Sequence, residues 1–439
     1  MMTRRTVLRS MAASALSRLA VNNAWAAPAD YRALVCVMLG GGNDCNNTVV
    51  PLNQSGYSAY AAARTSALAL AQNTLLPVKA KDGGEYGLHP RLVDLQRLYN
   101  SGKLAIVANV GVLACPTTRD EYRNRAVPLP QSLFSHSDQT TEWNNGTADI
   151  QSRTGWAGRT ADRLASSNSE TSLTGVSLAG INILLAGETV QPTLVTTGAQ
   201  TGLNGFSAAA DSQARLAAFE QLLNISEGSL LAKASAAATA EGMRISRLLS
   251  SVTSGTSPLK TVFPATALGR QLEQVARLIS ARDRLGVSRQ VYLVSMGGFD
   301  THVGQIASHD TLMLQVGQAL AAFYAATEEL GIARQVVAFT ESEFGRTLGP
   351  NSSSGSDHGW GGHHFVVGGA VRGGDLYGKF PAVAINSPDD VTGRGVWLPT
   401  TSVDQYAATL AGWLGVADSD LQAVLPNLKN FPVQKLGFL

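Results

Sequence analysis

The sequence predicts an α/β protein with a doubly wound, mostly parallel central sheet and helices on both faces. Three observations lead to this prediction: short continuous apolar runs recur, each ends in glycine or polar residues, and amphipathic stretches separate them. Such runs are typical of strands buried on both faces of a parallel sheet. The alternation of strand and helix is typical of doubly wound folds.

The first expected strand is Ala33–Leu39, which ends at the three consecutive glycines Gly40–Gly42. Helical stretches then alternate with further strands, and a closing helix is expected near the C-terminus. The expected helices are Pro90–Tyr99, Ala267–Leu285, Thr311–Leu330 and Val403–Leu414, and the expected strands are Leu104–Val110, Val291–Ser295 and Gln335–Phe339. Residues 27–439 are expected to form one domain.

The middle of the chain differs in composition from the rest. Residues 166–264 are rich in Ala, Ser, Thr and Gly, with helical stretches near Ser207–Leu223 and Ser229–Leu249. We interpret this region as a helical cap inserted into the α/β domain, where it would select the substrate.

The N-terminus has the pattern of an export signal. The twin arginines Arg4 and Arg5 precede a weakly apolar run, Met11–Val21, and a small-x-small cleavage site, Ala24–Ala26. This pattern predicts a Tat signal peptide over residues 1–26, recognised by the Tat machinery, and a periplasmic or secreted protein. The run is shorter than the roughly 20 residues of a membrane span, so no stable span is expected.

Charge and cysteine content exclude several classes of protein. With 34 basic and 32 acidic residues the net charge is +2, and removal of the signal's four arginines leaves −2. There is no basic stripe of the kind that binds nucleic acid. Three cysteines, Cys36, Cys45 and Cys115, are too scattered for a zinc finger. One disulfide is possible, and its pairing stays open.

A histidine cluster is the strongest chemical signal. Asp357, His358, His363 and His364 lie in a glycine-rich segment, Ser356–His364, which contains three of the seven histidines. Imidazole nitrogens beside a carboxylate suit a divalent metal ion. They fit zinc or manganese better than calcium, which prefers sites made only of oxygen ligands.

Polar residues that follow other apolar runs can join this cluster, because ligands gather at the carboxyl ends of the strands in such sheets. The candidates are Asp44, Asp300 with His302, and Glu343. Each also has a purely structural interpretation: Asp44 can be a turn or cap residue, Asp300 can cap a helix that begins near Gly304, and Glu343 can pair with a neighbouring arginine.

Ser135 and His136 form a further candidate pair. A serine beside a divalent ion can act as a nucleophile, and His136 can be a general acid or a substrate contact. Both residues can instead cap a helix that runs toward Trp143. A hydrolase-type triad is disfavoured, because no Gly-x-Ser-x-Gly turn follows a strand.

Ordered motifs together resemble a family of Tat-exported bacterial proteins known only as a domain of unknown function. They span nearly the whole mature chain. They are Gly-Gly-Asn-Asp, Leu88-His89-Pro90, Gly102-Lys103-Leu104, Ser135-His136, Gly155-Trp156-Ala157-Gly158-Arg159, Gly-Gly-Phe-Asp-Thr-His, Ser-Glu-Phe-Gly-Arg-Thr and Asp-His-Gly-Trp-Gly-Gly-His-His.

That family in turn resembles the alkaline phosphatase and sulfatase superfamily. The resemblance implies an alkaline phosphatase-like fold with one or two metals held by Asp44, Asp300, His302, Glu343, Asp357, His358 and one or both of His363 and His364. Glu343 stands where sulfatases have an aspartate, and the sulfatase Cys-x-Pro-x-Arg pattern is missing near Ser135, so formylglycine chemistry is not expected.

We therefore expect a metal-dependent hydrolase of phosphate or sulfate esters. Ser135 or a bound water would be the nucleophile, and Asn47 or Arg346 would bind an oxygen of a small anionic ester. The alternative is a non-catalytic secreted protein in which the metal is structural. The metal (Zn, Mn, Mg or Ca), the substrate and the oligomeric state stay open.

Overall fold

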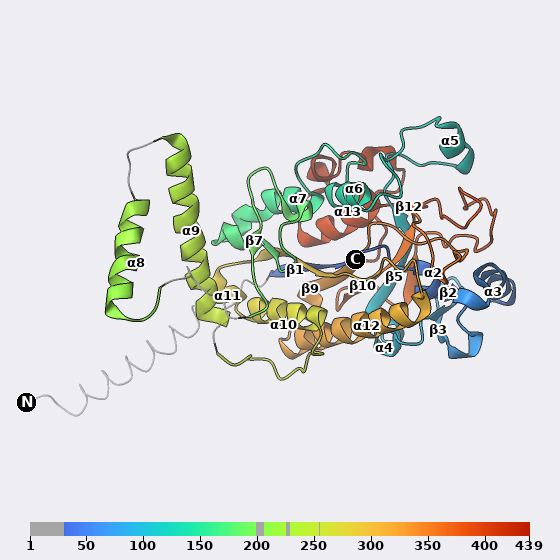
Figure 1. Ribbon diagram of the computed structural model, residues 1–439, viewed down its shortest axis with the longest axis horizontal. Coiled ribbons are helices and arrows are strands. Elements are labelled where there is room, and N and C mark those ends of the chain that lie inside the picture. Colours follow the sequence, from blue (N-terminus) through green and yellow to red (C-terminus); the bar gives the residue numbers. More distant parts are fainter. Residues whose placement is uncertain (1–29, 199–205, 225–228, 254) are drawn as a thin grey trace, which may run out of the picture.

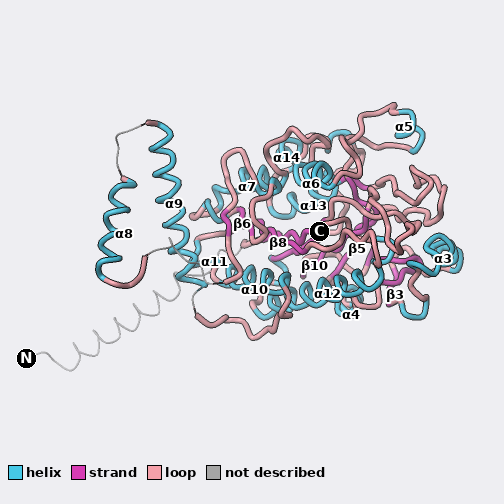
Figure 2. Tube along the Cα trace, in the orientation of Figure 1, coloured by secondary structure: helices cyan, strands magenta, loops and turns pink. Residues whose placement is uncertain are grey.

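The computed structural model describes residues 30–198, 206–224, 229–253 and 255–439. The expected export signal lies outside these residues. A central sheet crosses the molecule, with helices above and below it (Figures 1 and 2).

The described central sheet has the strand order β11-β5-β10-β9-β1-β8-β6-β7, and β12 pairs with β5. Its strands are β1 (Arg32–Leu39), β5 (Leu104–Gly111), β6 (Gly175–Ser177), β7 (Thr193–Leu194), β8 (Arg289–Met296), β9 (Val336–Glu341), β10 (Gly362–Gly368), β11 (Asp375–Tyr377) and β12 (Thr401–Ser402). All pairings are parallel except those of β10, which is antiparallel to both β9 and β5. The predicted doubly wound, mostly parallel α/β fold is confirmed.

Helices cover both faces of this sheet (Figure 1). One face is covered by α4 (Val93–Asn100), α10 (Ala267–Ser280) and α12 (Gln305–Glu329), and the other by α6 (His136–Asn145), α7 (Trp156–Leu164), α13 (Val403–Leu414) and α14 (Leu421–Val424). Each face has its own apolar core. The central strand β1 separates the two cores, because alternate side chains such as Val35 and Cys36 belong to opposite ones.

The closing helix α13 has the predicted bounds. Ser402 and Gln405 form a reciprocal capping box at its start, which satisfies backbone donors that a helix N-terminus leaves free. Ten of its twelve residues are buried, so packing against the sheet stabilises the helix.

The region predicted as a cap contributes to the central sheet, since β6 and β7 lie within residues 166–264. The predicted helices are present as α8 (Ala210–Leu223) and α9 (Leu230–Thr253), and they form a hairpin. Figure 1 shows this hairpin at one end of the molecule, beside α11 (Arg282–Leu285), far from α2 (Cys45–Thr48) at the carboxyl end of β1. The hairpin does not cover that end of the sheet.

The remaining elements are peripheral. A small sheet has the order β2-β4-β3, and one longer helix and several short ones lie outside the two main layers. These elements are β2 (Val49–Pro51), β3 (Leu76–Lys79), β4 (Glu85–Leu88), α3 (Gln54–Leu68), α5 (Arg119–Asn124) and the 3-10 helices Gln72–Thr74, Ala165–Ser167, Thr171–Leu173, Ile183–Leu185, Ala333–Gln335, Asp418–Asp420 and Leu428–Asn430. No helix among the described residues is both long and apolar enough to cross a bilayer. All three cysteines are described, and none forms a disulfide.

Candidate metal centre

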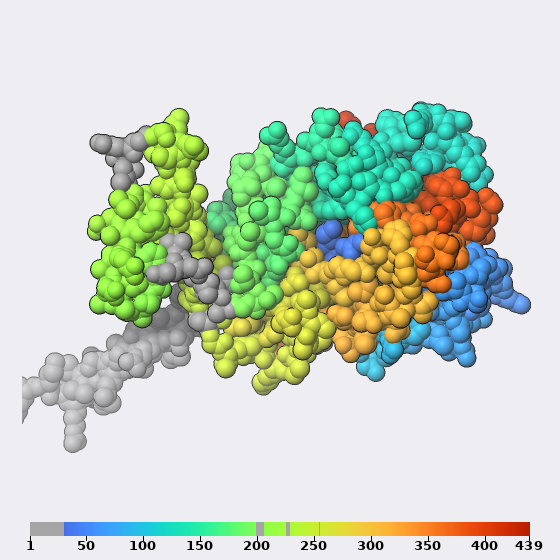
Figure 3. All heavy atoms as spheres, in the orientation of Figure 1, coloured from blue at the N-terminus to red at the C-terminus, as the bar shows by residue number. Residues whose placement is uncertain are grey.

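The site lies where β1, β8 and β9 end, as the rule for open α/β sheets predicts. In Figure 3 a hollow opens here, and its floor has the blue colour of residues near 40. Gly41 and Gly42 have φ values of +118° and +83°, and a side chain on Gly41 would lie 2.3 Å from the backbone nitrogen of Asp300. Glycine at these positions lets the loops after β1 and β8 approach closely.

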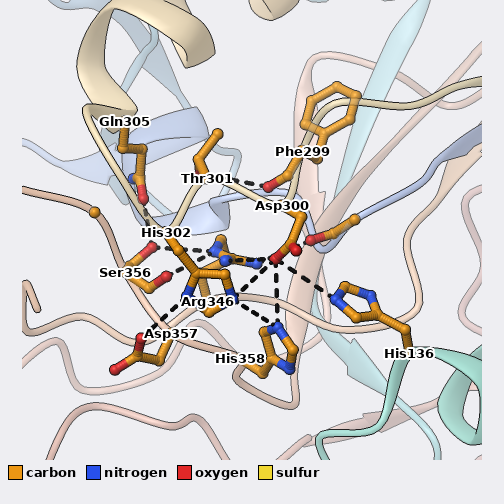
Figure 4. Close-up of polar contacts among 12 residues, drawn as sticks. His136, Phe299, Asp300, Thr301, His302, Gln305, Arg346, Ser356, Asp357 and His358 are labelled. Carbon is orange, nitrogen blue, oxygen red and sulfur yellow. Dashed lines mark hydrogen bonds and ion pairs between the residues drawn. The ribbon is translucent and has the colours of Figure 1, made fainter. Parts of the chain in front are cut away.

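Asp300 is the centre of a cluster of imidazoles (Figure 4). Its Oδ1 lies 3.0 Å from His302 Nε2, 3.3 Å from His358 Nε2 and 3.5 Å from His136 Nε2. The Nε2 atoms of His302 and His358 are 2.9 Å apart. Three chain segments far apart in the sequence therefore bring ligand atoms of His136, Asp300 and His358 within 4.8 Å of one another, and His302 Nε2 contacts two of these three residues.

The other ring nitrogen of each histidine contacts an oxygen that accepts a hydrogen bond. His136 Nδ1 lies 2.8 Å from Glu343 Oε1, and His302 Nδ1 lies 3.1 Å from Asp357 Oδ1. His358 Nδ1 lies 2.7 Å from the backbone oxygen of Phe134. Since carboxylate and carbonyl oxygens accept, each Nδ1 donates, and each neutral ring has a lone pair on Nε2.

This arrangement fits a divalent metal. Metal–nitrogen bonds of about 2.0–2.1 Å place neighbouring ligands of a tetrahedral ion roughly 3.3 Å apart. Four of the six pairs of ligand atoms are in contact, at 2.9–3.5 Å, and His136, Asp300 and His358 all lie within 4.8 Å of one another. Three imidazole lone pairs and a carboxylate oxygen repel one another unless a cation lies among them, so the donor set suits zinc, manganese or a similar ion.

Local charges keep the ligand groups in the protonation states that metals require. Partial burial acts to raise the pKa of Asp300, but the hydrogen bond and charge of Arg346, together with His302 and His136, hold it below its usual value. Burial lowers the pKa of His358, and the neighbouring histidines and Arg346 lower it further, against the opposing effect of the Phe134 carbonyl. Asp300 is therefore ionised and His358 neutral near pH 7.

The cluster is open to solvent. The exposed fractions of the side chains are 46% for Asp300, 39% for His302, 38% for His136 and 23% for His358. A water or a substrate can reach a metal at such a position, as catalytic metal sites require.

Glu343, Asp357 and Arg346 surround the cluster in supporting positions. Glu343 is buried, and its Oε1 accepts hydrogen bonds from His136 and the Gly41 backbone. Arg346 is also buried and donates to Asp300, the Gly41 carbonyl and Ser356. In this structure the donors of Arg346 hold protein oxygens, and its expected role as a substrate ligand stays a prediction.

Two residues that follow β1 and were expected in the site bind other residues in the protein interior instead. The fully buried carboxylate of Asp44 pairs with Arg64 and accepts from Gln305, and it also caps α2. Asn47 is buried and binds Tyr60, Arg64 and the Leu68 carbonyl. Neither side chain joins the cluster in this structure, because each is held by the buried partners given above.

His363 and His364 are also outside the cluster. They lie within β10, so their side chains point to opposite faces of the sheet. His363 Nδ1 accepts from the Asn109 backbone and its ring stacks on Phe380, whereas His364 packs against Trp143. Burial lowers the pKa of each to about 3. The structure therefore does not bring these two expected ligands to the cluster.

Ser135 and His136 have separate environments. Ser135 is the N-cap residue of α6, and its Oγ lies 3.2 Å from Ser137 Oγ on the exposed side. His136, expected to be catalytic, contributes a ligand nitrogen to the cluster.

Sequence reasoning missed three supporting groups. They are the Phe134 carbonyl, Asn351, whose amide donates to Asp357, and Arg394, which lies 2.6 Å from the second oxygen of Asp357. Phe134 has a φ of +74°, an unusual value for a bulky residue, and such strain is common at functional sites. No sequence pattern indicates any of the three.

The chain belongs to a known family. Residues 31–416 match the family model described as protein of unknown function (DUF1501). Comparison with curated proteins finds no match.

Solved structures with similar chains include sulfatases and a phosphonate hydrolase. Ps i-CgsB in complex with a neocarrahexaose has 10% identity, covers 91% of this chain and 77% of its own, and gives a TM-score of 0.36. The sulfatase PsFucS1 from Pseudoalteromonas sp. has 9% identity, coverage of 98% and 74%, and a TM-score of 0.35. The phosphonate monoester hydrolase of Agrobacterium radiobacter has 11% identity, coverage of 87% and 74%, and a TM-score of 0.31. Such values give no basis for transferring an activity.

Proposed function

We propose that this protein is a metal-dependent hydrolase of phosphate or sulfate esters. The observation that supports this most is the convergence of three imidazole nitrogens and one carboxylate oxygen at a solvent-open point. The ligands would be His136, Asp300, His302 and His358. A bound divalent ion would supply an activated water and a Lewis acid for the ester oxygen.

The surrounding residues orient these ligands. Glu343 and Asp357 fix the rings of His136 and His302 through their Nδ1 atoms, and the Phe134 carbonyl does the same for His358. Arg346 fixes Asp300. Partners of this kind set the orientation and basicity of metal ligands.

A water nucleophile is favoured over Ser135. The Ser135 hydroxyl contacts Ser137, and Ser135 reaches the cluster only through its neighbour His136. Arg394 is half exposed at the rim, where it pairs with Asp357. Its guanidinium can meet the negative charge of an anionic ester. The choice of esters also follows the order of motifs shared with the alkaline phosphatase and sulfatase superfamily.

The alternative is a non-catalytic protein in which the metal is structural. The observation that favours it is the number of protein ligands, because four can close a tetrahedral site. The solvent exposure of all four side chains favours the catalytic function.

Metal analysis combined with an aryl phosphate and aryl sulfate assay separates the two functions. We expect turnover that a chelator abolishes and added zinc or manganese restores, and that Asp300→Asn lowers at least about 100-fold. Asp418→Asn is the matched control, since Asp418 is 81% exposed and pairs only with Lys435 among the described residues. Metal retained without turnover on either ester would favour the structural alternative.

We also propose export through the Tat machinery to the periplasm or beyond. Changing Arg4 and Arg5 to lysine should leave the precursor in the cytoplasm, which cell fractionation measures. Unchanged export of this variant would contradict the proposal.

A further inference from the structure

A cavity formed by residues that precede His136 in the chain is lined by two arginines, Arg123 and Arg125. Its volume is about 730 Å³, and it lies under α5, where Arg123 and Arg125 line it together with Tyr122, Leu129, Ser132 and Leu133. Nothing in the hydrolysis proposed above uses these residues.

The cavity is connected to the cluster through two short paths. Leu133 precedes Phe134, whose carbonyl holds His358, and lies three residues before His136, a separation of at most about 11 Å along the chain. Tyr122 packs against Trp360, with ring centroids 5.5 Å apart. A ligand that fills the cavity therefore lies within a small molecule's length of the metal ligands.

The arginines differ from the cations of the neighbouring cavity. Neither Arg123 nor Arg125 is within 4.0 Å of a carboxylate in the part of the chain that the structure describes. In the next cavity, Lys379 lies 3.7 Å from Asp389, and Arg119 donates to the carbonyls of Asn386 and Ser387. Two free guanidinium groups beside apolar walls suit an anion attached to an apolar or ring-shaped body.

We propose that this cavity binds a second anionic group of the substrate, so that the preferred substrate has at least two phosphate or sulfate groups. The claim that the bound anion is part of the substrate rests on the proposed function. The claim that the cavity binds an anion does not. One anionic group would lie at the metal centre, and the second would accept hydrogen bonds from Arg123 and Arg125.

Binding of two polyanions tests the site separately from catalysis. Sucrose octasulfate and inorganic tripolyphosphate are titrated into Asp300→Asn protein at low ionic strength, where surface charges are least screened. We expect the double change Arg123→Gln with Arg125→Gln to raise the dissociation constant roughly tenfold. Binding of only one probe would identify sulfate or phosphate as the preferred group.

The control removes two charges elsewhere. Arg215 and Lys233 are exposed on the α8–α9 hairpin, and Arg215→Gln with Lys233→Gln should leave the dissociation constant unchanged. Equal effects of the two double variants, or no binding of either probe, would overturn the proposal. Circular dichroism checks that all variants fold.

Rates of ester hydrolysis show whether the anion-binding proposal or the proposed hydrolase function is the one that fails. The Arg123/Arg125 variant should hydrolyse a small aryl ester at the wild-type rate but should show a higher KM for an ester with a second anionic group. Absence of any turnover would contradict the hydrolase function and leave the binding result intact.

Discussion

His302 Nε2 and His358 Nε2 lie 2.9 Å apart, although neither nitrogen has a hydrogen when its ring is neutral. Their Nδ1 atoms are committed to Asp357 and to the Phe134 carbonyl. A single proton shared between the two rings would satisfy this contact. The lone pair of His136 Nε2 would still face the Asp300 carboxylate with no hydrogen between them. A metal ion satisfies all of these atoms together, which is why the site is interpreted as a metal centre.

Two histidines of the same sequence motif should differ in their effect on metal content. His358→Gln removes a ligand and should lower bound metal about 10-fold or more, whereas His364→Gln alters a residue inside β10 and should retain it. Elemental analysis of the purified variants measures this difference. Equal loss of metal from both would mean that the motif acts as one cluster.

Arg64 should be essential for stability. Its side chain and that of Asp44 are completely buried, so Arg64→Met leaves a carboxylate without its charged partner. The expected loss in unfolding free energy is about 3–5 kcal/mol. Urea denaturation measures it, and Arg64→Met combined with Asp44→Asn should recover part of the loss. A loss below about 1 kcal/mol would contradict the assignment of Asp44 to a buried pair.

The contribution of His364 to stability should depend on pH. Burial lowers its pKa to about 3, against about 6.5 in the unfolded chain. Between these values the unfolded chain binds a proton that the folded protein does not, so the wild type loses stability as the pH falls from about 6.5 toward 3. The stability advantage of the wild type over His364→Gln should therefore shrink from pH 7 to pH 4. A constant difference across urea titrations would contradict this prediction.

The contribution of Glu341 to stability should change with pH in the opposite direction. Burial raises its pKa to about 7, and one carboxyl oxygen has no partner. The folded protein keeps a proton that the unfolded chain loses above about pH 4.3, so the wild type loses stability as the pH rises from there to about 7. Glu341→Gln should gain stability relative to the wild type over this window and no further above it. Thermal denaturation at pH 5 and pH 8 measures the gain, and an equal difference at both would be inconsistent with a buried protonated carboxyl.

Most of the sheet could be predicted because its parallel strands are buried on both faces and appear as continuous apolar runs. Ala33–Leu39 and Leu104–Val110 each fall one residue short of the observed strand at one end. The strand β10 was missed, because glycines and two histidines obscure the short apolar run Phe365–Val367. A loop would leave His363 and His364 free to join the cluster, whereas the strand β10 holds both of them within the sheet.

The candidate site could be predicted in part. Asp300, His302 and His358 were expected ligands, since the carboxyl ends of β8 and β9 meet at one edge. Asp44 follows β1 at the same edge, but its carboxylate turns toward Arg64, which is 20 residues away on α3. Side-chain direction of this kind depends on a long-range ion pair, and local sequence does not reveal it.

Anomalous diffraction from crystals of the purified protein, grown without added chelator, tests the metal centre most directly. We expect one strong peak at the absorption edge of zinc, manganese or a similar metal, bonded to His136, Asp300, His302 and His358. A peak at His363 and His364, or no peak in protein that elemental analysis shows to contain metal, would contradict this expectation.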